Sequence, residues 1–231
     1  MTPMLPVGLP VPGWAARPMP LRQEMEGIYC RIEPLSVERH AEALFTAYAE
    51  AAENWTYLAL EPPADFAAYR AWVETVANEN DPLFHAIVER KSGRAVGVAA
   101  LMRIDVANGV IEIGHINFAP ALKRSRAGTE VIFLFARRVF DELGYRRFEW
   151  KCDSLNAASG RAARRYGFTF EGIFRQAVVY KGRNRDTAWF SIIDREWPRL
   201  REGYQRWLDP GNFDAEGRQR TSLGAWVGAA G

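Results

Sequence analysis

Apolar residues recur along the chain with two different spacings, which predict two kinds of element. Alternating apolar and polar residues, or a short apolar run, are typical of a strand, whereas spacings of three and four residues are typical of a helix. Helices are predicted over residues 36–50, 65–78, 129–143, 156–166 and 194–208. Strands are predicted over residues 29–33, 83–89, 95–103, 110–118, 147–152, 168–180 and 185–194. This order favours an α+β fold, with a mixed sheet that has helices on both faces.

The apolar positions of the fourth predicted strand change parity part-way along it. Ile111 and Ile113 share one face, whereas Ile116 and Phe118 lie on the opposite parity. One extra residue in the strand, a β-bulge near Gly114, would produce this change. Bulges are common beside active sites, so this strand is a candidate for the wall of a functional site.

Both ends of the chain differ in composition from the middle. Residues 1–25 are rich in proline and are expected to form an extended arm that lies on the body or on a partner. Residues 209–231 carry Gly, Ala and polar residues and are expected to form a loosely held tail. A single domain is therefore predicted over residues 26–208.

Composition and charge exclude several classes of protein. The net charge of the 231 residues is only +2, which argues against a nucleic-acid-binding protein. No apolar run is long enough to cross a membrane, and the N-terminus has no signal-peptide pattern. Two cysteines make neither a disulfide framework nor a metal motif. We therefore expect a cytoplasmic protein without a metal.

The segment between the fourth strand and the third helix carries the clearest chemical signal. It contains three basic residues, Lys123, Arg124 and Arg126, immediately before an apolar helix. The first N–H groups of a helix are unpaired and carry partial positive charge, so they bind phosphate well. A solvated basic turn is the alternative, but basic residues at a helix N-terminus are unfavourable unless an anion binds there.

Three groups of residues, in this order, resemble the GNAT superfamily of N-acetyltransferases and in particular its RimJ/RimL-like branch. The first group is Glu112-Ile113-Gly114-His115-Ile116-Asn117-Phe118 with Thr129-Glu130 after the loop. The second is Asn156-Ala157-Ala158-Ser159 with Arg165-Tyr166-Gly167-Phe168. The third is Phe170-Glu171-Gly172-Ile173-Phe174-Arg175 with Gly182, Asp186 and Glu196-Trp197 downstream. The resemblance covers about residues 28–200.

The resemblance implies direct transfer of the acetyl group of acetyl-CoA to a primary amine of a small molecule or a peptide. It also implies a mostly antiparallel sheet with a V-shaped splay between strands 110–118 and 147–152, where the pantetheine arm lies. A backbone N–H near Asn117 would polarise the thioester carbonyl. The residues that the resemblance assigns to acetyl-CoA are Ile116, Asn117, Phe118, Lys123, Arg124, Ser125, Arg126, Ala127, Gly128, Thr129, Asn156 and Ser159.

The chain departs from the family pattern at two positions. Arg126 replaces a glycine of the pyrophosphate loop, where glycine allows backbone to approach phosphate closely. Ala163 replaces a tyrosine that protonates the leaving thiolate in many relatives. Ser159 resembles the serine used in RimL-type enzymes, so it is the expected group beside the sulfur. An ordinary helical serine is the alternative reading of Ser159.

The general base has three candidates, which are Glu112, His115 and Glu171. An amine must lose a proton to attack, and carboxylates and imidazoles are the usual proton acceptors. Each candidate also has a structural reading, as a packed histidine or a carboxylate in an ion pair. Trp55 and Tyr57 lie in the loop where relatives build the acceptor site, and they are expected either to line that site or to pack beneath it.

Several properties remain open at the level of sequence. A late basic run is either a solvated face or a contact with the 3′-phosphate or an acidic substrate; it comprises Arg161, Arg164, Arg165, Arg175, Lys181, Arg183 and Arg185. The acceptor is a protein N-terminus or a small-molecule amine, and a homodimer is possible through the arm. The alternative function is a catalytically silent acyl-CoA-binding sensor or scaffold, because a fold does not fix a function.

Overall fold

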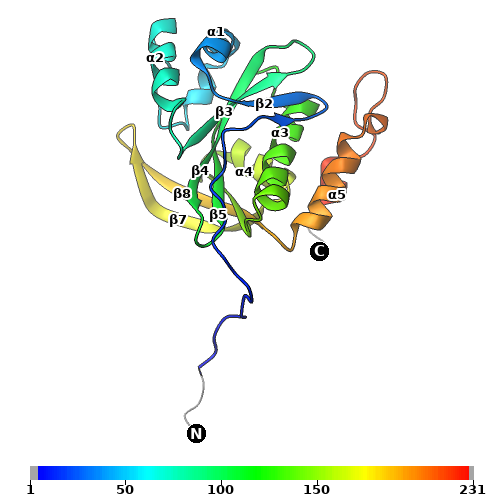
Figure 1. Cartoon of the computed structure of the whole chain (residues 1–231). Helices are drawn as coiled ribbons and strands as arrows, with labels where there is room; N and C mark the ends of the chain where they lie inside the picture. Colours follow the sequence, from blue (N-terminus) through cyan, green and yellow to red (C-terminus); the bar gives the residue numbers. More distant parts are fainter. Residues whose placement is uncertain (1–4, 229–231) are drawn as a thin grey trace.

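The computed structural model describes residues 5–228, in which eight strands form one mixed sheet (Figure 1). The strand order across the sheet is β1-β2-β3-β4-β5-β6-β8-β7, and only β5 and β6 run parallel among these pairs. The strands are β1 (Met25–Glu26), β2 (Cys30–Pro34), β3 (Leu83–Glu89), β4 (Ala95–Asp105), β5 (Val110–Phe118), β6 (Arg147–Asp153), β7 (Thr169–Tyr180) and β8 (Arg183–Ile193). The expected α+β fold is confirmed.

Side-chain caps fix where most of the helices begin. Ser36, Asp65, Ser125 and Asn156 each accept a hydrogen bond from the backbone N–H three residues later. The helices are α1 (Val37–Tyr48), α2 (Phe66–Val76), α3 (Arg126–Arg137), α4 (Ala157–Arg165), α5 (Trp197–Leu208) and α6 (Leu223–Val227). Short helical segments are η1 (Ala52–Trp55), η2 (Arg138–Glu142) and η3 (Pro210–Asn212). The cap places the start of α3 three residues before the predicted Thr129.

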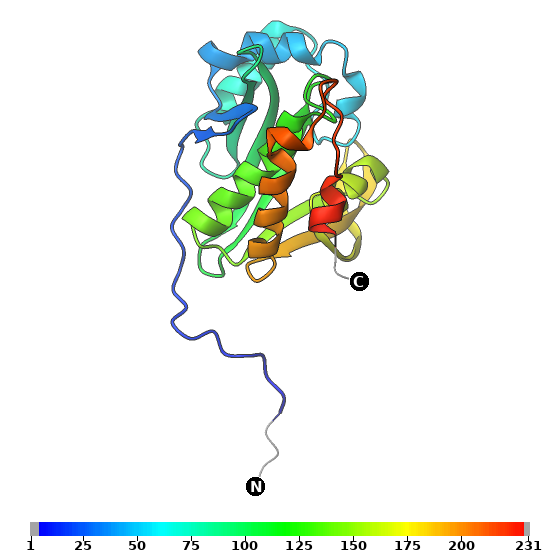
Figure 2. The same ribbon diagram turned by 90° about the vertical axis from the view of Figure 1, so that its right-hand side faces the viewer.

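Two consecutive residues of β3 show that helices cover both faces of the sheet. The Phe84 ring packs 5.7 Å from the Trp72 ring of α2, whereas the His85 ring packs 5.4 Å from the Phe135 ring of α3. Successive side chains of a strand point to opposite faces. Helix α2 therefore lies on one face, and α3 on the other with α5 beside it (Figure 2).

The sheet opens in the middle because β5 and β6 pair along only part of their length. Parallel pairing joins Val110–Ile113 to Arg147–Trp150 and then ends. Beyond that point β5 also bulges, since Ala99 of β4 faces two residues between Gly114 and Asn117. His115 takes the extra position with a φ of +49°. The predicted splay and the predicted bulge are both confirmed.

The N-terminal arm is anchored to the body at Trp14 and is extended before it. The Trp14 indole donates to the Ala107 carbonyl oxygen at 2.9 Å, and the Arg17 N–H donates to that of Val106 at 2.8 Å. Figures 1 and 2 both show residues 5–13, which precede this anchor, leading away from the body. Its apolar side chains are exposed, with 81% for Leu5 and 92% for Leu9.

Residues 209–228 are not the loosely held tail that composition suggested. Leu223 and Val227 of α6 are buried against α5. The Trp207 indole donates to the Gln219 side chain at 2.8 Å, and Phe213 packs edge-on against the Trp207 ring at 5.2 Å. This segment has too few apolar residues to predict a helix from the sequence. Two of them, Leu223 and Val227, are sufficient to anchor the short helix α6.

A buried carboxylate ties the start of the sheet to α3. Glu130 is 2% exposed, and its carboxylate accepts backbone N–H groups from Ile28, Tyr29 and Cys30 at 2.6, 2.7 and 2.9 Å. Three charge-assisted bonds offset much of the cost of burying a charge. This contact holds the β1–β2 turn against α3.

Candidate active site

A groove of about 540 Å³ lies at the opening between β5 and β6. Its walls come from the α1–α2 loop and from β4, β5, β6, β7, β8 and α4. The expected site residues that line it are Tyr57, Glu112, His115, Ile116, Asn156 and Ser159. Residues far apart in the sequence thus meet where the sheet separates.

The N-terminus of α3 has free backbone donors. The Ser125 hydroxyl accepts the Gly128 N–H at 2.9 Å, and the Ser125 carbonyl accepts the Thr129 N–H at 3.3 Å. The N–H groups of Arg126 and Ala127 belong to the first helical turn, so they have no partner within the helix. Gly128 is needed for packing, because a Cβ there would lie 2.4 Å from the Leu122 carbonyl oxygen.

Two basic side chains of this loop, those of Lys123 and Arg126, contact other parts of the protein. The Lys123 ammonium lies 2.9 Å from a carboxylate oxygen of Glu53. The Arg126 guanidinium stacks 4.2 Å from the centre of the Phe213 ring and 5.4 Å from that of Tyr29. Arg126 has helical backbone geometry, so the expected glycine is not required there, and its side chain fastens the C-terminal segment. Arg124 has a φ of +58°.

Thr129 is buried and does not face the groove. Its hydroxyl accepts a hydrogen bond from the Arg165 guanidinium at 3.1 Å, and the residue is 1% exposed. The Thr129 side chain is therefore packed in the interior and is not available to the predicted phosphate site. The Arg165 guanidinium also lies 5.3 Å from the centre of the Trp207 ring. This arginine of the late basic run therefore packs against other side chains of the protein.

The start of α4 presents Asn156 and Ser159 to the groove. The Asn156 side-chain oxygen accepts the Ser159 N–H at 3.0 Å, so Asn156 caps the helix and still has its amide N–H₂ to donate. The Trp150 indole donates to the Ser159 hydroxyl oxygen at 2.9 Å. Because the indole only donates, the hydroxyl proton of Ser159 is directed to another acceptor.

Cys152 also borders the groove and is 7% exposed. Burial raises the pKa of the Cys152 thiol above its ordinary value, and a hydrogen bond with Ser159 lowers it by less. The thiol therefore stays protonated near neutral pH. A buried thiol that stays protonated is unreactive.

A row of charges forms the floor of the groove on the α2 face. Glu112 is 3% exposed, and one of its oxygens accepts from Arg103 at 2.8 Å and lies 2.9 Å from the Lys151 ammonium. Lys151 is also 2.7 Å from Glu149, which balances its charge. The other oxygen of Glu112 lies beside Gly114, where a Cβ would come 3.4 Å from it and 2.3 Å from the Met102 sulfur. The absence of a side chain at Gly114 thus makes room for Met102 beside this carboxylate oxygen.

His115 lies between the groove and an aromatic cluster. Its ring is 4.9 Å from the Phe84 ring. Burial lowers the pKa of His115 and the positive charge of Arg103 lowers it further, so the imidazole is neutral near pH 7. A neutral imidazole can accept a proton, but the same surroundings disfavour the imidazolium that would result.

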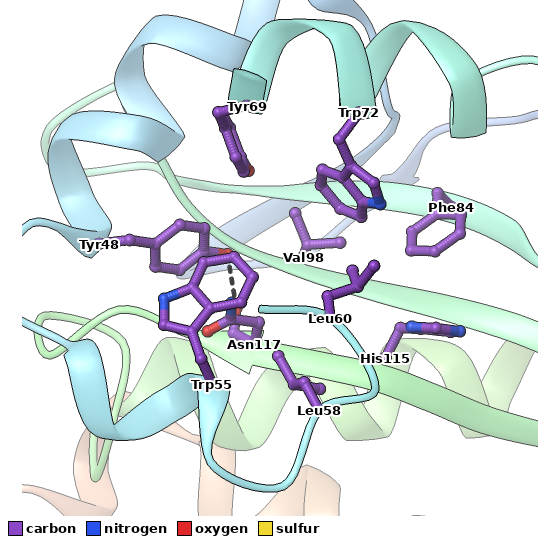
Figure 3. A pocket seen from close by; sticks show the side chains of 10 residues that line it. All are labelled: Tyr48, Trp55, Leu58, Leu60, Tyr69, Trp72, Phe84, Val98, His115 and Asn117. Carbon is purple, nitrogen blue, oxygen red and sulfur yellow. Dashed lines mark hydrogen bonds between the residues drawn. The ribbon is translucent and has the colours of Figure 1, made fainter. Parts of the chain in front are cut away.

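Trp55 and Tyr57 have different positions. Trp55 is 6% exposed and lines a small, mainly aromatic cavity of about 10 Å³, space for no more than one water, whose lining Figure 3 shows. Tyr57 lines the groove, and its hydroxyl donates to the Leu155 carbonyl at 3.2 Å. Trp55 is therefore core beneath the loop rather than a wall of the acceptor site.

The end of β5 differs in one respect from the expectation. Ala119 donates its N–H to Val96 of β4, so Asn117, two residues earlier, also turns its backbone toward β4. The Asn117 carbonyl accepts the Tyr48 hydroxyl at 2.8 Å (Figure 3). Phe118 faces the other side, where its carbonyl accepts from Asn54 at 2.9 Å. Phe118, rather than Asn117, therefore has backbone groups directed away from β4.

Glu171 lies outside the groove. Its carboxylate accepts a bidentate pair of hydrogen bonds from Arg147, at 2.7 and 2.5 Å, and one from the Ser191 hydroxyl at 2.7 Å. The Arg147 hydrogen bonds lower the pKa of Glu171, so it remains a carboxylate with all its contacts structural. Its expected role as general base is not supported, because its carboxylate does not line the groove.

A family model described as "Acetyltransferase (GNAT) domain" matches residues 30–169. The chain belongs to the GNAT family of acetyltransferases. GNAT enzymes use acetyl-CoA as the acetyl donor, so acetyl-CoA is the co-substrate here.

Similar proteins agree with this assignment. A GCN5-related N-acetyltransferase from Brucella melitensis has a structure with a TM-score of 0.92 and 50% identity, over 94% of this chain and 99% of its own. A structure from Chromobacterium violaceum, described as a probable acetyltransferase (GNAT family), has a TM-score of 0.78 and 41% identity, over 86% and 100%. An uncharacterized N-acetyltransferase p20 from Bacillus licheniformis is 24% identical, over 75% of this chain and 99% of its own.

Some groove residues were not predicted from the sequence. Arg103 and Lys151 complete the charged floor, Trp150 orients Ser159, and Thr187 and Trp189 form part of the far wall. The alternation of Arg185, Thr187 and Trp189 along one strand was a usable signal. Among residues 5–228 no cluster of His, Cys, Asp and Glu is arranged to hold a metal ion. Within that same range, no helix combines the length and apolar character needed to cross a membrane.

Proposed function

We propose that this enzyme transfers the acetyl group of acetyl-CoA directly to a primary amine. One arrangement carries the proposal: Ser159 borders the groove from α4 on one face, and Glu112 borders it from β5 on the other. A proton donor and a proton acceptor on opposite sides of one opening fit a reaction in which one group gains a proton and another loses one. GNAT membership supplies the acetyl donor but leaves the acceptor open.

Each group has a role in the proposed reaction. The amine nitrogen bonds to the thioester carbonyl carbon, and the bond from that carbon to sulfur breaks. Glu112 takes the amine proton at the oxygen beside Gly114, directly or through a water, while Arg103 and Lys151 hold its other oxygen. The Ser159 hydroxyl donates its hydrogen bond to the departing sulfur. The Phe118 N–H polarises the carbonyl oxygen.

We further propose that the free N–H groups of Arg126 and Ala127 bind the pyrophosphate of acetyl-CoA. These donors and the positive end of the α3 dipole suit an anion. Lys123 adds a nearby positive charge, although its ammonium is also paired with the Glu53 carboxylate. Asn156 reaches the pantetheine with its amide N–H₂. Ile116 and Phe118, which border the splay, are the backbone groups proposed to pair with it.

The proposal also includes the branch of the family, the cellular compartment and the oligomeric state. The motif around Asn156 and Ser159 supports a RimJ/RimL-like enzyme that acts on a protein N-terminus or a small-molecule amine. Two free cysteines, both buried, suit the reducing cytoplasm. The exposed apolar side chains from Leu5 to Val11 suit contact with a second copy of the chain, and gel filtration of the full chain and of a chain lacking residues 1–13 tests this.

Release of free thiol from acetyl-CoA, measured over a panel of primary amines, tests the proposed activity. The proposal expects release that depends on both the enzyme and one class of amine. Calorimetric binding of acetyl-CoA without release by any amine would favour a silent acyl-CoA-binding protein instead. Glu171→Gln is the matched control for Glu112→Gln, since both are ion-paired carboxylates but only Glu112 borders the groove.

A further inference from the structure

Three hydrogen-bond donors on one strand lack partners in the wall of the groove. Arg185, Thr187 and Trp189 alternate along β8, so their side chains share one face. The Arg185 Nε, the Thr187 hydroxyl and the Trp189 indole nitrogen are buried, and none has a hydrogen-bond partner among residues 5–228. All three residues line the groove. Buried donors are normally paired, and each unpaired one costs about 1–3 kcal/mol.

This face of β8 is the one opposite α4. Trp189 stands beside Lys151 in the register of β6 and β8, and Lys151 shares its parity with Glu149, which stands beside Glu112. Trp150, of opposite parity, reaches Ser159 of α4. The three donors therefore lie on the Glu112 side of the opening, where the proposed function places the acceptor amine.

Charge distinguishes Arg185 from the other cations of the groove. Lys151 is held by Glu112 and Glu149, and Arg103 is held by Glu112. Arg185 has no carboxylate within ion-pair distance in the described part of the chain. Asp153, the other carboxylate of the lining, accepts from the Tyr180 hydroxyl and the Leu155 N–H.

Two of the donors, Trp189 and Thr187, are also packed against their neighbours or buried. The Trp189 ring lies 3.8 Å from the Lys151 ammonium and 4.5 Å from the Phe174 ring. Thr187 is 5% exposed. Arginine and the indole only donate, and the hydroxyl donates as readily as it accepts. A ligand group that satisfies all three must bring several acceptor oxygens, and the unpaired charge of Arg185 favours a negative one.

We propose that the acceptor carries an oxyanion, a carboxylate or a phosphate, as well as its amine, and that Arg185, Thr187 and Trp189 bind this oxyanion. The inference rests on the proposed function, since it names the class of amine that the same groove takes. The amine then points toward Glu112 while the oxyanion lies against β8. An acidic amine of this kind is an amino acid or an amine phosphate ester.

Matched pairs of amines test the proposal in the thiol-release assay. The pairs are L-phenylalanine with phenethylamine and O-phosphoethanolamine with ethanolamine, so each pair differs by the oxyanion and the two pairs separate carboxylate from phosphate. The wild-type enzyme is expected to prefer the anionic member of at least one pair by tenfold or more in kcat/KM. Equal use of both members in both pairs would overturn the inference while leaving the proposed function intact.

Variants of β8 locate the effect. Arg185→Gln is expected to raise KM for the preferred anionic amine roughly 10- to 100-fold, the range for a hydrogen bond to a charged group, and to leave its neutral partner unchanged. Trp189→Phe keeps the ring and removes one donor, so a smaller rise of the same kind is expected. Arg183→Gln, at an exposed position of the same strand, is the control. Equal loss for both members of a pair would contradict the assignment.

A binding measurement decides the matter if no amine in the panel reacts. Calorimetry compares 3-phenylpropionate with 3-phenyl-1-propanol, which has the same carbon skeleton without the charge, and inorganic phosphate is titrated as the second oxyanion. Tighter binding of either oxyanion by the wild type than by Arg185→Gln supports the site, even where the proposed transfer fails. Binding that is unchanged by Arg185→Gln, or no better than that of the alcohol, overturns it.

Discussion

Replacing Gly128 with alanine is expected to weaken both the fold and acetyl-CoA binding. The added Cβ would lie 2.4 Å from the Leu122 carbonyl oxygen, whereas ordinary contact begins at 3.4 Å. The loop and α3 must therefore separate by about 1 Å, because neither neighbour is a flexible side chain. The same movement disturbs the Ser125 cap, whose hydroxyl bonds both the Leu122 carbonyl and the Gly128 N–H.

The size of the effect follows from these two contacts. Overpacking costs about 1–3 kcal/mol and loss of a cap about 1 kcal/mol, which together give about 2–4 kcal/mol. A chain of this length loses about 2–4 °C of melting temperature per kcal/mol, so a decrease of about 4–16 °C is expected. Loss of one charge-assisted bond to the pyrophosphate would also weaken acetyl-CoA binding at least about tenfold.

Thermal unfolding and calorimetric titration with acetyl-CoA measure the two effects separately. Gly224→Ala is the control, since nothing lies within 4 Å of a Cβ there and alanine favours a helix. That variant is expected to melt at or above the wild-type temperature with unchanged affinity. If Gly128→Ala binds acetyl-CoA as tightly as the wild type while the loop is strained, the pyrophosphate does not lie at the N-terminus of α3.

Four other substitutions test separate parts of the account. Ser159→Ala is expected to lower kcat about tenfold or more with little change in acetyl-CoA affinity, measured by thiol release and calorimetry, and an unchanged rate would remove Ser159 from the mechanism. Glu112→Gln is expected to lower kcat about 100-fold, whereas Glu171→Gln leaves kcat near the wild-type value; the opposite order in thiol-release assays would reverse their roles. Glu130→Gln is expected to cost about 3–5 kcal/mol in urea unfolding because three backbone donors lose a carboxylate, with the exposed Glu74→Gln near zero as its control. Burial lowers the pKa of His85 to about 4, below an unfolded value near 6.5, so its contribution to stability is complete above pH 6.5 and is lost as the pH falls toward 4. The loss amounts to about 2 kcal/mol at pH 5. His85→Phe should therefore flatten the plot of urea-unfolding free energy against pH by that amount, and a plot as steep as that of the wild type would refute this reasoning.

Local patterns were sufficient for most of the fold. Capping residues such as Ser36 and Asp65 fixed helix starts because the cap bond is made within four residues of chain. The parity change around Gly114 predicted the bulge because side-chain direction along a strand depends on residue count alone. The C-terminal segment escaped prediction, since its order depends on distant partners such as Arg126 stacking on Phe213.

The site was predictable only where a motif marked it. Asn156 and Ser159 stand where the resemblance placed them, at the start of α4 facing the groove. The ion pairs of Glu112 and Glu171 could not be read from the sequence, because their partners come from other strands. Arg126 looked like a phosphate ligand from its position in the loop, but aromatic rings brought close by the fold take up its guanidinium.

The most direct test of acetyl transfer follows both products of one reaction. The purified enzyme is incubated with acetyl-CoA and its best amine, and free thiol and N-acetylated amine are measured at the same times by absorbance and mass spectrometry. The wild type is expected to form equal amounts of the two products, and Ser159→Ala is expected to lose both to the same extent. Thiol release without acetylated amine, or an acetylated amine formed equally fast without the enzyme, would contradict it.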